Sequence, residues 1–196
     1  MTETINNILF FWFGALDDHG MSAPSQHALW FKSSTSTDHV CRDRFGELVA
    51  QAIAGELLHW SRTDKGLIAL ILLLDQLPRN VYRGTPGAFS GDKMALELAK
   101  ATIAAGHHRR LPAIHQVFLL LPLEHSENLD TQEQCVGLFS ELVDIAGSEA
   151  IAGFSRYAVA HRDVIAQFGR FPHRNTILGR DSSAQELEYL DTHGGF

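Results

Sequence analysis

The sequence has little of what marks several common protein classes. Its two cysteines, Cys41 and Cys135, lie far apart, each without a second cysteine nearby, so we expect neither a disulfide framework nor a cysteine-based metal site. The longest apolar run, residues 66–74, is far shorter than the ~20 residues that a membrane-spanning helix needs. The N-terminal apolar stretch lacks the basic residues and the cleavage site of a signal peptide. A cytoplasmic protein that does not bind membranes is therefore predicted.

Motifs of metal and cofactor sites are also missing. The chain contains no HEXXH, no G-x-S-x-G, no G-x-x-x-x-G-K-[ST] and no G-x-G-x-x-G pattern. Adjacent His107 and His108 would point about 100° apart on a helix, whereas helical ligands of one metal ion usually lie three or four residues apart. The formal charge of −7 opposes binding to nucleic acid, because affinity for phosphates comes from lysine and arginine. We expect no metal, no cofactor and no nucleic-acid partner.

The remaining composition is that of an ordinary helical protein. With 196 residues, 45% of them hydrophobic, the whole chain, 1–196, is expected to form a single domain around one core. Apolar residues recur three and four apart almost throughout and sustained period-two alternation is absent, which predicts an all-α fold. Capping residues, glycines and prolines divide the chain into about eight helices.

Punctuating residues set the expected helix boundaries. Ser36, Thr37 and Asp38 are expected to begin one helix. The section from Leu67 to Leu74 is apolar on all sides and is predicted to be the central buried helix. Pro78 and Pro122 are expected to end their helices, and a Ser183 capping box to begin a short final helix. Short connections between helices indicate antiparallel neighbours stacked as helical hairpins.

Three segments place charged and amide residues beside strongly apolar ones: residues 75–80 (DQLPRN), 123–127 (LEHSE) and 161–180 (HRDVIAQFGRFPHRNTILGR). Residues 156–180 contain five arginines and a single acid, a local charge of +4 in an acidic protein. The planar guanidinium fork matches carboxylate and phosphate groups. Such arginines can hold an anionic ligand, or they can brace carboxylates of the protein itself.

The polar members of these segments are the candidate site residues. Imidazole titrates near neutral pH, which suits proton transfer, although a histidine in a helical core is more often a packing residue. His161 and Asp163 are two apart and should lie on different faces of a helix, whereas Asp75 and Arg79 are four apart and share a face if the helix continues locally. The candidate catalytic residues are His125, His161 and His173; the candidate ligand-binding residues are Asp75, Arg79, Asn80, Glu124, Arg162, Asp163, Arg170, Arg174, Asn175 and Arg180.

The order of four motifs resembles a known family. FFWFG, ALILLLDQLPRNVYRGTPGAF, LLPLEHSE and HRDVIAQFGRFPHRNTILGR are similar to motifs of the bacterial domain of unknown function 924, and the resemblance covers nearly the whole chain. It implies an all-helical fold of the tetratricopeptide-like superfamily and implies no particular activity. Leu77 replaces the usual phenylalanine of DQFPRN, an exchange that should alter packing more than chemistry.

Two functional hypotheses and one structural alternative follow. The first is a site that binds a small anionic metabolite through the arginines, with chemistry performed by a histidine and oriented by Asp75 or Glu124. The second is a tetratricopeptide-like adaptor whose concave surface captures a protein or an acidic peptide. The alternative is a network of charged side chains that only pins helix ends together. Convergence of the candidate residues on an accessible site would favour the first.

Overall fold

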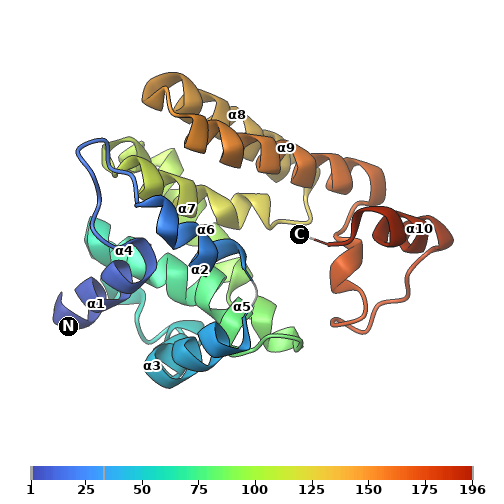
Figure 1. Ribbon diagram of the computed structural model, residues 1–196, viewed down its shortest axis with the longest axis horizontal. Helices are drawn as coiled ribbons and strands as arrows, with labels where there is room; N and C mark the ends of the chain where they lie inside the picture. The colour runs from blue at the N-terminus through green and yellow to red at the C-terminus, as the bar shows by residue number, and fades with distance from the viewer. Residues whose placement is uncertain (1, 33, 196) are drawn as a thin grey trace.

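The protein is all-helical, which confirms the predicted fold class (Figure 1). The structure, a computed structural model, describes residues 2–32 and 34–195. Its α-helices are α1 (Thr2–Phe13), α2 (His27–Phe31), α3 (Thr35–Ile53), α4 (Asp64–Ile71), α5 (Leu77–Val81), α6 (Asp92–Ala104), α7 (Ala113–Glu124), α8 (Leu129–Ala146), α9 (Glu149–Phe168) and α10 (Ala184–His193). A π-helical turn, η3 (Leu72–Gln76), joins α4 to α5, and short 3-10 turns connect several other helices.

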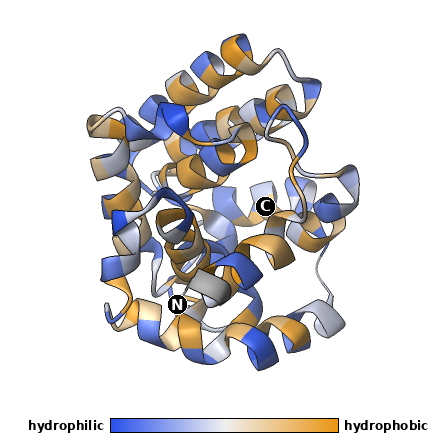
Figure 2. Ribbon diagram, turned by 90° about the vertical axis from the view of Figure 1, so that its left-hand side faces the viewer, coloured by the Kyte–Doolittle hydropathy of each residue, from blue (hydrophilic) through white to orange (hydrophobic). Residues whose placement is uncertain are grey.

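Consecutive helices pack against one another through the second half of the chain. Helix α6 contacts α7, α7 contacts α8, and α8 and α9 form an antiparallel hairpin along one side of the molecule (Figure 1). In the first half, α3 packs instead against α5 and the π-helical turn, and α1 packs on α4. The expected hairpins are therefore clearest from α6 onward. Figure 2 shows apolar and polar stretches alternating along single helices, as in amphipathic helices.

The core is centred on α4 and the π-helical turn. Every residue from Ile68 to Leu74 is fully buried, in agreement with the central buried helix predicted from the sequence. A second, smaller apolar cluster of Val164, Ile165 and Phe171 lies at the end of α9, with Phe168 and Tyr189 beside it. Within the described residues, no helix is both long and apolar enough to cross a lipid bilayer.

Two helix ends differ from the sequence prediction. Pro78 does not end a helix, because the chain passes through the π-helical turn and Pro78 occupies the first turn of α5, where a missing N–H is tolerated. Pro122 lies inside the last turn of α7, which continues to Glu124. A third helix, α3, begins earlier than predicted, since the Ser34 side chain accepts from the Thr37 amide and forms the cap. The Ser183 capping box is present as predicted.

Candidate functional site

A buried carboxylate at the π-helical turn organises the site. The turn widens the helix at Leu72–Gln76 and places the Asp75 side chain, with no exposed surface, in the interior. π-helical turns inside α-helices occur frequently at functional sites. Asp75 belongs to a group of side chains from α5, α6, α7, α9 and the segment after α9, which we call the central polar cluster: Asp75, Arg79, Asp92, Glu124, His125, His161 and Arg174.

His125 follows α7 and is held directly by Asp75. Its Nδ1 lies 2.8 Å from Oδ1 of Asp75, and Gln76 donates to Oδ2 at 2.6 Å. Burial opposes the charge of Asp75, but attraction by His125 and Arg79 and the hydrogen bonds from His125 and Gln76 hold its pKa well below the usual range. An ionised carboxylate only accepts hydrogen bonds, so Nδ1 of His125 carries a proton.

The second nitrogen of His125 is left for other partners. Within the described part of the chain, Nε2 makes no hydrogen bond and is not enclosed, and the side chain keeps 14% of its surface exposed. Burial, helped by the nearby charge of Arg79, lowers the pKa of His125 against the opposing effects of Asp75 and Asp92. At neutral pH the ring is therefore neutral, with an unprotonated Nε2.

Arg79 ties Asp75 to Asp92. It donates to the main-chain oxygen of Asp75, and its two terminal nitrogens donate to both carboxylate oxygens of Asp92 at 3.0 and 3.3 Å. Burial raises the pKa of Asp92, and the nearby Asp75 adds to this effect against the attraction of Arg79. The pair keeps about a fifth of each side chain exposed, 23% for Arg79 and 21% for Asp92, so one edge of the cluster reaches solvent.

Arg174 brings a second guanidinium to the cluster. Its Nη1 donates to the main-chain oxygen of His125 at 3.1 Å and lies 3.6 Å from Oδ2 of Asp92. The rings of Phe89 and Phe171 lie 4.9 and 4.5 Å from its central carbon, so the cation is in cation–π contact with both. Its Nε is buried without a hydrogen-bond partner among the described residues. Burial and the neighbouring Arg79 lower the pKa of Arg174 to about 10, which keeps it charged at neutral pH.

Glu124 and His161 form a second carboxyl–imidazole contact, of a different kind. Nδ1 of His161 donates to the main-chain oxygen of Tyr157 at 2.9 Å and lies 3.3 Å from Oε1 of Glu124. Burial lowers the pKa of His161 to about 3, while burial and repulsion by Asp75 raise that of Glu124 to about 8. The short contact would suit an ion pair, but both groups are neutral at pH 7, because the interior penalises each charge and Tyr157 already takes the Nδ1 proton.

The comparisons with known proteins agree with the fold. Residues 8–194 match the sequence profile of a family described as bacterial protein of unknown function (DUF924). The chain belongs to this family. A solved structure of a protein of unknown function from Agrobacterium tumefaciens is 32% identical, with a TM-score of 0.81 over 97% of this chain and 98% of that one. No curated protein matches the chain significantly.

In this DUF924 chain, several of the sequence-predicted site residues lie outside the central polar cluster. Asn80 donates instead to Asp38 at 2.8 Å, beside an Arg83–Asp38 ion pair. Arg162 is bonded to Glu133 and to its neighbour Asp163 on the outside of α9. These contacts have the geometry of structural braces, and the different faces expected for His161 and Asp163 are confirmed, since His161 is buried and Asp163 exposed.

A second group of predicted residues fastens the segment after α9. Arg180 donates to both oxygens of Glu127 at 2.6 and 2.9 Å and to the side-chain oxygen of Asn175. Arg170 is paired with Glu186 on α10 at 2.7 and 2.9 Å. These contacts fasten the segment that carries Arg174 to Glu127 and to α10.

His173 lies next to the cluster. Its ring is 5.6 Å from that of Phe171, and burial lowers its pKa to about 4. Asp92 and Phe89 are not among the residues predicted from the sequence, although both contact the arginines of the cluster. An acid and an aromatic residue beside a turn carry no signal of their own; only the packing of α6 against the π-helical turn brings them to Arg79 and Arg174.

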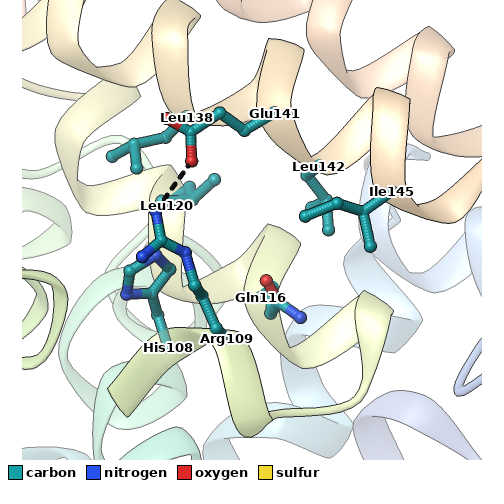
Figure 3. Close-up of a pocket in the computed structure, with 8 residues that line it drawn as sticks. All are labelled: His108, Arg109, Gln116, Leu120, Leu138, Glu141, Leu142 and Ile145. Atoms are coloured by element: carbon teal, nitrogen blue, oxygen red, sulfur yellow. Dashed lines mark hydrogen bonds and ion pairs between the residues drawn. The ribbon is translucent and has the colours of Figure 1, made fainter. Parts of the chain in front are cut away.

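Two surface hollows lie elsewhere. One is between α7 and α8, where Arg109 donates to Glu141 at 3.1 Å and apolar side chains, including Leu120 and Leu142, line the hollow (Figure 3). The other is an open depression of about 460 Å³ between α9 and α10, beside Tyr189. Neither contains a member of the central polar cluster.

Proposed function

We propose that the protein binds a small anionic metabolite at the central polar cluster, with Arg174 as the principal anion-binding residue. The observation that carries this proposal is the unused edge of the Arg174 guanidinium. Its polar contacts are all made by Nη1, whereas Nε and Nη2 have no hydrogen bond within the residues that the structure describes. These two nitrogens form the side-on fork that binds a carboxylate or a phosphate through two parallel hydrogen bonds.

The surroundings of this edge favour a ligand-binding role for Arg174 over a purely structural one. A buried donor without a partner weakens a fold by ~1–3 kcal/mol, and more when the group is charged. The nearby braces Arg170–Glu186 and Arg180–Glu127, by contrast, satisfy both oxygens of their carboxylates. Arg174 is held by Phe89 and Phe171 at the faces of its guanidinium, and this positioning would reduce the entropy lost on binding.

Charge also supports a small ligand over an extended acidic peptide. Four of the five predicted arginines, all except Arg174, already donate hydrogen bonds to carboxylates of the chain. Arg162 and Arg170 have carboxylate partners of their own, Glu133 and Glu186. Peptide capture would require several unpaired cations along one open surface. The adaptor hypothesis stays a prediction, to be tested by charge reversal and partner capture.

The test compares anion binding by two arginine variants. Acetate and inorganic phosphate, followed by a panel of small carboxylates and phosphate esters, are titrated into the isotope-labelled protein and amide chemical shifts are recorded. Arg174→Lys keeps the charge but removes the fork, so affinity should fall ~10- to 100-fold, the equivalent of one or two charge-assisted hydrogen bonds. Arg156→Lys is the matched control, because Arg156 is two-thirds exposed on α9 and paired with Glu149.

The control variant should bind as the wild-type protein does. The proposal is wrong if no anion of the panel shifts the amides around Arg174, or if Arg174→Lys binds as tightly as Arg156→Lys. Unchanged far-UV circular dichroism and thermal midpoint of both variants would establish that the comparison concerns binding and not folding.

A further inference from the structure

Three histidines are candidates for proton transfer, and their hydrogen bonds separate them. Nδ1 of His161 donates to a main-chain carbonyl, which offers no charge to stabilise an imidazolium. Glu127, whose charge acts to raise the pKa of His173, is engaged by Arg180 and by the amide of Phe171. His125, by contrast, has Nδ1 on an ionised, fully buried carboxylate, that of Asp75.

We propose that His125 is the general base of this site and takes a proton from an anionic substrate held by Arg174. The inference rests on the proposed function, since it requires an anion at the Nε edge of Arg174. Asp75 fixes the tautomer of the ring with hydrogen on Nδ1, which leaves the lone pair on Nε2 to accept a proton. Arg174 donates from Nη1 to the main-chain oxygen of the same residue, His125, so the guanidinium and the imidazole belong to one cluster.

The proton balance of the step is simple. Nε2 accepts the proton of an acidic C–H or O–H group of the substrate, and the electron pair of the broken bond stays on the substrate. The resulting imidazolium is paired with the Asp75 carboxylate, and Arg79 and Arg174 stabilise the negative charge that develops on the substrate. Delivery of the proton from Nε2 to a different atom of the same molecule, which uses the electron pair there to form the new bond, completes an isomerisation without any oxidant, reductant or second substrate.

The charges of the cluster favour this direction of transfer. The groups facing His125 are Asp75 on the π-helical turn, Arg79 on α5, Asp92 on α6, Glu124 on α7, His161 on α9 and Arg174 after α9. With Glu124 and His161 neutral, two arginines balance two aspartates. A bound anion adds one negative charge, which makes a positive charge on His125 more favourable.

The ligand class therefore follows from the arrangement. The substrate carries one carboxylate or phosphate group for the Arg174 fork, and it carries its transferable proton close to that group. A compact acid fits better than a long chain, because both side chains are largely buried, with 14% of His125 and 8% of Arg174 exposed.

The first measurement is the tautomer of His125 in the wild-type protein, from nitrogen chemical shifts and long-range couplings of its ring. We expect the form protonated on Nδ1 alone at pH 7. A ring protonated on Nε2 alone, or on both nitrogens, would overturn the proposal without any variant being needed.

The second measurement is the reactivity of Nε2 toward diethyl pyrocarbonate, which acylates unprotonated imidazole nitrogens. Peptide mass spectrometry follows each of the 11 histidines separately. His125 should be modified, and Asp75→Asn should slow this roughly tenfold or more, because an amide can donate to Nδ1 and select the wrong tautomer. The exposed His59, bonded to the main-chain oxygen of Glu56, is the internal reference whose rate should not change.

Binding is tested in the same reaction. Phosphate, at concentrations that occupy the site in the chemical-shift titration, should protect His125 and leave His59 reactive. If phosphate is bound yet His125 is unprotected, or if Asp75→Asn leaves the rate unchanged in a folded protein, His125 is not the base. A titration that shows no anion binding at all contradicts the proposed function separately.

Discussion

Replacing Glu124 by glutamine should make the protein more stable than wild type above neutral pH, because it removes a carboxyl group that would ionise in the core. Glu124 is 4% exposed, and its Oε2 is buried without a partner among the described residues. Because burial raises its pKa from 4.5 to about 8, the folded protein holds the Glu124 proton more tightly than the unfolded chain does. Stability from this group is complete below about pH 4.5 and is lost as pH rises to about 8.

The size of the effect follows from the two pKa values. Their separation sets an upper limit of about 5 kcal/mol for the stability lost across this range. We expect roughly half of that, since an ionising buried carboxyl group draws in water and rearranges its neighbours. Glutamine has the shape of the neutral acid and does not titrate, so Glu124→Gln should avoid the loss.

Urea denaturation between about pH 5 and pH 8.5 measures this directly, as the difference in unfolding free energy between variant and wild type. The two proteins should differ by less than about 1 kcal/mol at pH 5, and the variant should be more stable by ~2–3 kcal/mol at pH 8.5. Glu141→Gln is the control, because Glu141 is more than half exposed in its pair with Arg109. That variant should stay parallel to wild type.

Two results would refute the reasoning. Parallel pH curves for Glu124→Gln and wild type would mean that Glu124 ionises normally in the folded state. A variant less stable by several kcal/mol at pH 7 would mean that Glu124 is ionised and paired with a protonated His161, since breaking a buried ion pair typically costs ~3–5 kcal/mol.

Three further predictions concern the supports of the site. Gly91→Ala should destabilise the fold by at least ~3 kcal/mol in urea denaturation, because a Cβ there would overlap the main-chain oxygen of Leu74 in the π-helical turn. Gly137→Ala, which has open space around it, should be neutral or gain up to ~1 kcal/mol, and equal effects of the two substitutions would contradict the prediction. Ser183→Ala should lose about 1 kcal/mol of stability through the capping box, and Ser183→Thr should retain most of it. Glu127→Gln should lower the free energy of unfolding by ~1–3 kcal/mol, because the neutral amide is a weaker acceptor for Arg180 and for the Phe171 amide. In 1 M salt this difference from wild type should become smaller, and a difference that does not change with salt would contradict the prediction.

The sequence predicts which segments supply the central polar cluster, but not which of their residues belong to it. Three polar segments stood out because charged side chains beside leucine and phenylalanine must find partners, and members of all three do meet in the central polar cluster. The segments could not be resolved residue by residue, however. Arg170, Arg174 and Arg180 have the same chemistry in the sequence, and only their partners distinguish them. Glu186 and Glu127 pair with two of them, whereas Nε of Arg174 has no hydrogen bond among residues 2–32 and 34–195.

The sequence by itself determined the helical class, the buried position of residues 68–74, the capping box at Ser183 and the family, because these depend on periodicity, local hydrogen bonds and motif order. Tertiary structure alone decided that Pro78 follows a π-helical turn instead of ending a helix, that Asp92 joins the central polar cluster, and that His125 is held by the buried Asp75. Each of these three features depends on which residues, far apart in the sequence, pack together and shield one another from water. Burial and distance between residues far apart in the chain set charge states, and no local pattern encodes them.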